Sequence, residues 1–411
     1  MDLSAEKQLE LIRANTVEII PEEELLKKLR SGRPLRVKLG VDASGPDIHL
    51  GHAVVLRKLR LFQDLGHTAV MIVGDFTGMI GDPSGRSDTR RQLTREQVER
   101  NIANYKDQLF KILDPERTEF RYNSEWLGKL APEQIMRLAA THTVAQLLAR
   151  DDFAKRYQAQ QPIGLHEFLY PLFQGYDSVA VRADVEIGGT DQTFNFLVAR
   201  ELQRADPLGQ PQEPQCIITF PLLVGTDGVE KMGKSLNNYI GIMEPPEEVF
   251  GKLMSIPDEV IASYLELCTN VPAGEIDQMA AEMQSGALNP RDAKRRLGRE
   301  IVTLYHSAEA AEAADGTFMS VFSTSRQQTR EDYEAVAEEV AIPAELRGKP
   351  VWVATALAEL GLTSSKGEAR RLVRGGGVYV DERRVSDAQE EIHLTAGMLL
   401  RVGKRRVARL A

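Results

Sequence analysis

The sequence predicts an α/β protein: a doubly wound parallel-sheet domain, then an all-α domain, then a small basic α+β domain. Three observations predict this order. Residues 30 to about 225 alternate short apolar runs with amphipathic helical stretches. Beyond Pro245 the periodicity is helical almost without interruption to about Val340, and the end of the chain reverses the sign of the charge.

The first unit of the α/β domain is a strand, a helix and a buried strand. Leu35–Val41 alternates apolar and polar residues at period two, which is typical of a strand. Gly51–Gly66 carries apolar residues at three- and four-residue steps and ends at a glycine, as a helix does. Ala69–Val73 is a continuous apolar run, typical of a strand covered on both faces.

The same alternation continues through the domain. Further strands are expected near Phe120, at Val181–Ile187 and at Gln215–Thr219, and helices at Arg95–Leu113, Pro132–Arg150 and Asp191–Arg204.

Composition sets the broad class. The 411 residues are 42% hydrophobic and 27% charged, as in folded, water-soluble proteins. The longest uncharged apolar stretch, Cys216–Gly225, is far shorter than the roughly 20 residues that span a bilayer, and the N-terminus has no signal-like pattern. We expect a cytoplasmic protein that does not associate with a membrane. Cys216 and Cys268 are the only cysteines, so neither a disulfide framework nor a protein metal site is predicted.

Charge divides the chain. The net charge is −9, but residues from Lys349 onward carry +5, which leaves −14 for the rest. Pro343 and Pro350 mark the boundary before this basic segment, because proline often separates structural units. The expected domains are an α/β domain at 1–225, a loop and linker at 226–245, a helical domain at 246–346 and a basic domain at 347–411.

The turn after the first strand holds polar residues at the start of a helix. Asp42, Ser44, His49, Gly51 and His52 lie where a parallel sheet binds ligands, because helix N-termini favour phosphate there. Two imidazoles three residues apart suit a phosphoryl group in displacement. The alternative is a pair of surface histidines at a helix cap.

A second cluster is Lys231-Met232-Gly233-Lys234-Ser235, in a loop rich in Gly and Asn. Its two ammonium groups could clamp a leaving pyrophosphate. An ordinary solvated loop is the alternative for either lysine alone.

Together, His49-Leu50-Gly51-His52 and Lys231–Ser235 resemble the HIGH and KMSKS signatures of class I aminoacyl-tRNA synthetases, which bind nucleotides on a Rossmann-like domain. The resemblance implies catalytic roles for His49, His52, Lys231, Lys234 and Ser235, and ATP contacts that include Gly40, Asp42, Ser44 and Gly51.

Other residues resemble the tyrosyl-tRNA synthetase family. Asp82 matches the acidic anchor of the substrate ammonium group. Tyr170, Gln174 and Asp177 share one face of a predicted helix, and in the family this stripe binds tyrosine, with Asp177 at the phenol hydroxyl. Gly188–Gln192 matches the GGxDQ segment, which implies that Gly189 and Asp191 contact ATP and that Gln192 faces the reaction centre. For that segment alone, a common loop and helix cap would be the alternative.

One position departs from the family. Many tyrosyl enzymes have a tyrosine where this chain has Lys38, as a second partner of the phenol oxygen. Strand alternation places Lys38 on the same side as Gly40 and Asp42, so it is a candidate tyrosine-binding residue. Either it pairs with Asp177 or the binding geometry differs.

The basic end of the chain reads as a capped helix, a glycine turn and a strand. It resembles the RNA-binding module shared by a ribosomal small-subunit protein, pseudouridine synthases and bacterial tyrosyl-tRNA synthetases, which implies tRNA contacts by Lys366, Arg370, Arg371 and Arg374. The alternative is an ordinary basic tail.

The resemblance covers nearly the whole chain. It implies a homodimer that activates L-tyrosine with Mg²⁺-ATP and transfers the tyrosyl group to tRNA(Tyr). Two alternatives remain: a tryptophanyl-tRNA synthetase, and a synthetase-like RNA-binding protein without catalysis.

Overall fold

The computed structural model describes residues 3–42, 45–84, 93–209, 211–322, 333–334, 337–343, 345–363, 365–381, 383–403 and 406–411. The chain divides into two compact units. Unit 1 comprises Met1–Glu244 and Ser255–Leu297, and unit 2 comprises Pro245–Met254 and Gly298–Ala411.

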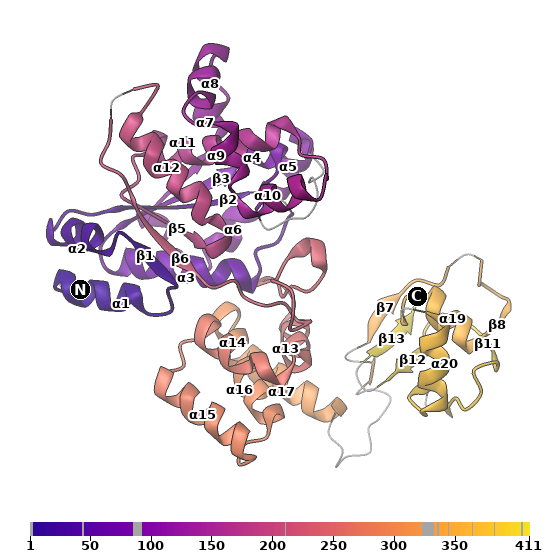
Figure 1. The fold of residues 1–411 in the computed structure, drawn as a ribbon. Coiled ribbons are helices and arrows are strands. Elements are labelled where there is room, and N and C mark those ends of the chain that lie inside the picture. Colours follow the sequence, from indigo (N-terminus) through magenta and orange to yellow (C-terminus); the bar gives the residue numbers. More distant parts are fainter. Residues whose placement is uncertain are drawn as a thin grey trace. The chain divides into compact units, whose positions relative to one another are not determined.

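A six-stranded sheet organises unit 1, in the order β1-β6-β5-β2-β3-β4 (Figure 1). Every pair is parallel except β1 with β6. The strands are β1 (Glu18–Ile20), β2 (Arg36–Asp42), β3 (Thr68–Gly74), β4 (Thr118–Tyr122), β5 (Val185–Gly189) and β6 (Cys216–Phe220).

The strand order defines a switch point. The chain passes from β2 to β3 and β4 on one side, then returns to β5 and β6 on the other side of β2. Neighbouring strands β2 and β5 therefore send their connections in opposite directions, which opens a crevice at their carboxyl ends. The predicted doubly wound α/β class is confirmed.

Helices cover both faces of this sheet (Figure 1). They are α1 (Ala5–Arg13), α2 (Glu22–Arg30), α3 (Leu50–Asp64), α4 (Thr77–Ile80), α5 (Arg95–Ile102), α6 (Tyr105–Leu109), α7 (Ser124–Leu127), α8 (Pro132–Ala139), α9 (Val144–Leu148), α10 (Asp151–Gln158), α11 (Tyr170–Val181) and α12 (Thr193–Ala205).

Several predicted bounds were wrong. The strand expected from Val181 begins at Val185, because α11 continues through Val181 and ends at Arg182 in the left-handed region. The single helices expected at 95–113 and 132–150 are each two shorter helices. Helices α1 and α2 and strand β1 were not predicted.

From Pro246 to Phe322 the described elements are all helical: α13 (Pro246–Ser255), α14 (Ile261–Cys268), α15 (Ala273–Ser285), α16 (Pro290–Tyr305) and α17 (Ala308–Phe322), with a short 3₁₀ turn at Asp258–Val260. The expected helical periodicity up to Val340 is wrong at its end. Glu338–Val340 is strand β7, paired in parallel with β13 (Arg406–Leu410).

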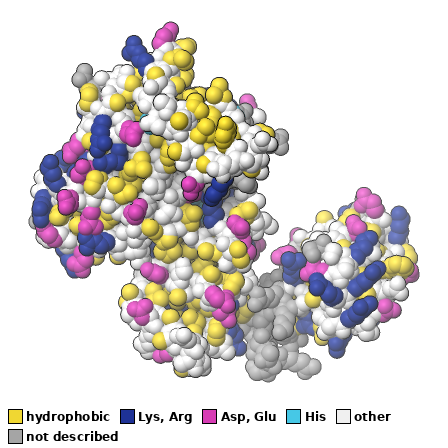
Figure 2. Space-filling view, viewed as in Figure 1, with side chains coloured by type: hydrophobic (Ala, Val, Ile, Leu, Met, Phe, Trp, Pro, Cys, Tyr) yellow, Lys and Arg dark blue, Asp and Glu magenta, His cyan; other side chains and the backbone are white. Residues whose placement is uncertain are grey.

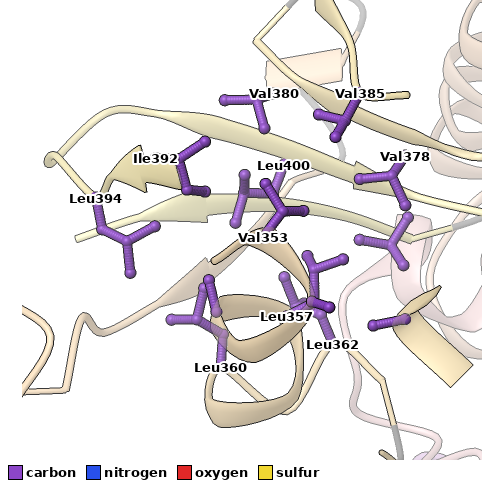
Figure 3. Packing of buried hydrophobic residues seen from close by; sticks show 14 of the residues in the cluster. Val353, Leu357, Leu360, Leu362, Val378, Val380, Val385, Ile392, Leu394 and Leu400 are labelled. Atoms are coloured by element: carbon purple, nitrogen blue, oxygen red, sulfur yellow. The ribbon is translucent and has the colours of Figure 1, made fainter. Parts of the chain in front are cut away.

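The C-terminal module has its own core (Figure 3). Val353 and Leu357 from α19 (Val353–Glu359) pack with Val378 and Leu400 from the strands, and all four are fully buried. Its other elements are α20 (Lys366–Arg374), β8 (Pro350–Trp352), β9 (Val378–Val380), β10 (Arg383–Arg384), β11 (Glu391–His393), β12 (Leu399–Val402) and β13 (Arg406–Leu410). Five of the strands form one sheet in the order β10-β9-β12-β13-β7. Because β7 belongs to this sheet, we propose that the module begins before residue 347.

Candidate active site

A cavity of about 650 Å³ lies at the switch point of the sheet. It brings together residues that are up to 197 positions apart, from Leu39 on β2 to Leu236, which follows Lys231 and Lys234 in the segment here called the lysine loop. The candidate residues that line it are Gly40, Asp42, His49, Gly51, His52, Asp82, Tyr170, Gln174, Asp177, Gly189, Asp191, Gln192, Lys231, Lys234 and Ser235. Ser44 lies outside the described residues.

The two histidines stack at the start of α3. Their ring centroids are 3.8 Å apart, and the backbone N–H of His49 donates to Nδ1 of His52 at 3.3 Å. This bond leaves Nε2 of His52 as the protonated ring nitrogen. A Cβ on Gly51 would lie 3.1 Å from the His49 ring, so a larger residue there would push the ring aside.

Both imidazoles are neutral. Burial, followed by the positive charge of Lys234, lowers the pKa of His49 to about 3. Burial also lowers the pKa of His52 well below its usual value, with His49 and Lys234 adding to the effect. The pair can therefore donate hydrogen bonds to phosphate oxygens as neutral rings.

The lysine loop reaches the same cavity. Nζ of Lys231 lies 2.9 Å from Oδ2 of Asp191. Nζ of Lys234 donates to the carbonyl oxygen of Gly45 at 2.9 Å and to the Tyr105 hydroxyl at 3.1 Å. Asn238 fixes the loop, because its Oδ1 accepts from Gly233 N–H at 2.8 Å and its Nδ2 donates to Asp227 at 2.5 Å.

The GGxDQ-like segment turns tightly at the end of β5. A Cβ on Gly189 would fall 2.6 Å from Cδ2 of Leu222 and 2.7 Å from Oδ1 of Asp191, so a larger residue there would displace these two side chains. Gln192 follows and donates from Nε2 to Oδ2 of Asp82 at 2.9 Å. The other oxygen of Asp82 accepts from the backbone and hydroxyl of Ser84.

The stripe on α11 lines one side of the cavity, as its spacing predicts. The Tyr170 hydroxyl donates to Asp42 at 2.9 Å. Gln174 accepts from Asn195 at 2.8 Å, and its Nε2 lies 3.3 Å from Oε1 of Gln192.

Asp177 is almost completely buried and accepts two hydrogen bonds. Trp126 Nε1 donates to its Oδ1 at 2.8 Å, and Asn123 Nδ2 to its Oδ2 at 3.2 Å. Burial raises the pKa of Asp177 to about 7, against the lowering effects of Lys38 and these two donors.

Lys38 does not lie where its candidate role requires. It is fully buried, is not among the residues that line the cavity, and forms an ion pair of 2.7 Å with Glu186 on β5. Of the two alternatives for Lys38, an ion pair with Asp177 is not found; the ion pair joins Lys38 to Glu186 instead. The carboxylate of Glu186 belongs to β5, the strand next to β2. The alternation of residues along β2 does not show which strand lies beside it.

Sequence reasoning missed Asn123, Trp126 and Tyr105. Asn123 and Trp126 follow the carboxyl end of β4, so their position at a parallel-strand end was a usable signal. Tyr105 is fully buried in α6 and carried no such signal. Within the described residues, no group of three or more His, Cys, Asp or Glu side chains is placed to hold a metal ion.

In the C-terminal module the predicted basic residues share one helix face. Lys366, Arg370, Arg371 and Arg374 are exposed on α20, whereas Ala369 and Val373 are buried. Ser365 caps this helix by accepting from Glu368 N–H at 3.2 Å. The face of the module seen in Figure 2 carries many Lys and Arg side chains.

A switch-point cavity that joins histidines at a helix start to a loop with two lysines defines a class I aminoacyl-tRNA synthetase. The family model described as tRNA synthetases class I (W and Y) matches residues 30–323, and that of the S4 domain matches residues 351–396. With the relatives described next, this match shows that the chain belongs to the tyrosine–tRNA ligase family.

The relatives match over their full length. The chain is 51% identical to the tyrosine–tRNA ligase of Moorella thermoacetica, over 98% of this chain and 95% of that protein. It is 49% identical to the enzyme of Geobacter sulfurreducens, over 99% of each chain, and 48% identical to that of Thermotoga maritima, over 100% and 98%.

Solved structures share the fold. Tyrosyl-tRNA synthetase of Archaeoglobus fulgidus, complexed with L-tyrosine, aligns with a TM-score of 0.61 at 24% identity, over 76% of this chain and 100% of that chain. A truncated mitochondrial tyrosyl-tRNA synthetase of Aspergillus nidulans aligns with a TM-score of 0.62 at 22% identity, over 78% and 94%.

Proposed function

We propose that this tyrosine–tRNA ligase uses the switch-point cavity to activate L-tyrosine with ATP and then transfers the tyrosyl group to tRNA(Tyr). The observation that carries the proposal is the position of Asp177. It lines the cavity that also contains both signature motifs, so the amino acid and ATP can bind in one enclosure.

The tyrosine end recognises two polar groups. The carboxylate of Asp82, with Tyr170, Gln174 and Gln192 beside it, would receive the ammonium group. Asp177 would accept the phenol hydroxyl. A site built to hydrogen-bond a hydroxyl rejects a substrate without it, because a buried polar group is left unpaired; tyrosyl-tRNA synthetases are themselves the standard example.

The ATP end would place the α-phosphate beside the stacked histidines. The tyrosine carboxylate attacks that phosphorus, the bond to the β-phosphate oxygen breaks, and pyrophosphate leaves with tyrosyl-adenylate formed. Neutral His49 and His52 donate to the phosphoryl oxygens, and Lys231 and Lys234 balance the charge on pyrophosphate. Asp191 and Gly189 would bind the ribose, with Gly40, Asp42, Ser44 and Gly51 along the rest of the nucleotide. Ser235 would act in catalysis with the two lysines, as the last residue of the KMSKS-like segment.

Mg²⁺ would enter as part of the substrate, bound to the phosphate oxygens of ATP, which are the hard ligands that it prefers. In the second step, the terminal ribose hydroxyl of tRNA(Tyr) attacks the tyrosyl carbonyl and releases AMP.

The C-terminal module would bind the tRNA through Lys366, Arg370, Arg371 and Arg374. We also propose a homodimer in the cytoplasm. Exposed apolar side chains on neighbouring segments support the dimer: Met136 on α8, Val144 on α9, Tyr157 on α10 and Leu165 just after them. No helix of the described residues is long and apolar enough to cross a membrane.

Pyrophosphate exchange with each of the twenty amino acids tests the proposal. Exchange that depends on ATP and occurs only with tyrosine is expected. Exchange with tryptophan but not tyrosine would contradict it.

A further inference from the structure

Lys38 is a fully buried cation that the proposed mechanism does not use. Its ammonium group has three hydrogen-bond acceptors: Oε1 of Glu186 at 2.7 Å, Oγ of Ser178 at 2.9 Å and the carbonyl oxygen of Gln174 at 3.0 Å. These three bonds match the three N–H groups of an ammonium ion, so the lysine is held in one position.

Two of these acceptors belong to the helix that carries Asp177, the residue proposed to accept the phenol hydroxyl. Gln174 and Ser178 belong to α11 and flank Asp177 in sequence. Glu186 closes the network, because its Oε2 accepts from Ser178 Oγ at 3.0 Å and also from Gln215. The turn of α11 that presents Asp177 is thus tied to both β2 and β5, the two strands of the switch point.

The same network places charge near Asp177. The positive charge of Lys38 favours the ionised carboxylate, and the negative charge of Glu186 opposes it. The other groups that face Asp177 are the neutral donors Asn123 and Trp126. Lys38 and Glu186 are therefore the charged pair that acts on this carboxylate.

We propose that Lys38 is a positioning residue that determines specificity for tyrosine: with Glu186, it fixes the α11 turn that carries Asp177, and its own positive charge favours the ionised carboxylate at the phenol hydroxyl. The inference rests on the proposed role of Asp177. A buried ion pair contributes little net stability compared with apolar residues, so a role in recognition gives a reason for this pair.

Unit 1 offers a matched control. Lys28 is also buried, donates to the carbonyl oxygen of Pro214 at 3.0 Å and lies 3.9 Å from a carboxylate, that of Asp184. It does not line the cavity. Lys28→Met therefore removes a buried lysine without touching the tyrosine site.

The test compares Lys38→Met, Glu186→Gln, the double variant and Lys28→Met. The full-length protein is assayed by pyrophosphate exchange, and kcat/KM for tyrosine is measured across neutral pH, together with KM for ATP. We expect Lys38→Met to move the acidic limb of the tyrosine profile to higher pH and Glu186→Gln to move it to lower pH, each by about one pH unit. The double variant should return the limb toward its original position.

At pH 7, Lys38→Met should lose about fivefold in kcat/KM for tyrosine, with KM for ATP unchanged. A purely structural pair would give losses of similar size at every pH, without opposite shifts, and that result would overturn the inference. A shift of the same kind in Lys28→Met would also overturn it. If Lys38→Met does not fold, the shift of the acidic limb in Glu186→Gln tests the inference by itself, because this variant keeps the lysine.

Asp177→Asn separates this inference from the proposed function. If this variant keeps full preference for tyrosine over phenylalanine, the role of Asp177 is wrong. If it loses the preference but the Lys38 and Glu186 variants show no shift, only the role of Lys38 is wrong.

Discussion

The ammonium group of Lys231 lies 2.9 Å from a carboxylate oxygen of Asp191, so an ion pair joins the lysine loop to the turn after β5. The two side chains are 37% and 18% exposed, and such a pair contributes only about 0–1 kcal/mol. In the proposed mechanism, ATP would therefore displace this pair at little cost. Binding of the ribose at Asp191 would release Lys231 toward pyrophosphate.

The first prediction concerns the two signature lysines. Lys231→Ala and Lys234→Ala should each slow formation of tyrosyl-adenylate by about 10²-fold, because each removes a charge that is needed mainly as pyrophosphate leaves. The affinity for tyrosine should stay nearly unchanged. Single-turnover kinetics with varied tyrosine measure both quantities.

Lys129→Ala is the control for this prediction, because Lys129 is exposed and does not line the cavity. Full activity of Lys234→Ala would remove that lysine from the mechanism.

The second prediction concerns amino-acid discrimination. Asp177→Asn should reduce the preference for tyrosine over phenylalanine by about tenfold to a hundredfold, since a hydrogen bond to a charged group contributes about 1.5–3 kcal/mol. The ratio of kcat/KM values in pyrophosphate exchange measures the change. An unaltered ratio would mean that another group recognises the phenol.

The third prediction uses the raised pKa of Asp177, which is about 7 in the fold and 3.8 without perturbation. Between these values the folded protein binds a proton that the unfolded chain does not bind, so this group lowers stability as the pH rises from about 4 to about 7. The free energy of unfolding of Asp177→Asn, minus that of the original protein, should therefore increase over this range.

Denaturant titrations at a series of pH values measure this difference. The slope with pH is diagnostic, because loss of a hydrogen bond to Trp126 or Asn123 would shift the difference equally at all pH values. A constant difference would argue against a strongly raised pKa.

The fourth prediction separates the two chemical steps. Reversal of charge at Arg370 and Arg371 should leave tyrosyl-adenylate formation intact, because the cavity residues all lie before residue 237. The affinity for tRNA should fall, and its dependence on salt should become shallower, since fewer phosphates are neutralised. Both arginines are exposed, so the module should still fold.

The matched control reverses the exposed residues Lys27 and Arg204 of unit 1. Removal of the chain after Phe322 should give the same result as the arginine variants, and this position avoids cutting β7 from its sheet. If either altered protein charges tRNA normally, the module is not the tRNA-binding element.

The fifth prediction concerns assembly. Leu165→Asp places a charge among the exposed apolar side chains of the proposed dimer surface and should shift the protein from dimer to monomer in sedimentation. Val229→Asp is the control, because Val229 is equally exposed, at 80%, but lies in the lysine loop. A monomeric original protein would contradict the homodimer.

Local sequence determined much of this protein. Period-two and helical patterns located β2, α3 and β3, because each of these elements buries a continuous face of its own residues. The spacing of Tyr170, Gln174 and Asp177 was enough to put them on one helix face, since the α-helix fixes which residues are neighbours. The two signature motifs could also be recognised from the sequence alone, because each is a short, contiguous segment. Residues of both motifs line the cavity.

Only the tertiary structure decided which distant groups meet. The pairing of Lys38 with Glu186 depends on β2 and β5 being neighbours, although 148 positions separate the two residues. Strand β7 was predicted as part of a helical stretch because its partner, β13, lies 70 positions later in the sequence. The neutral state of His49 likewise follows from burial that no local pattern reveals. Strand pairing and desolvation depend on residues far apart in sequence, whereas periodicity and motifs depend only on neighbours.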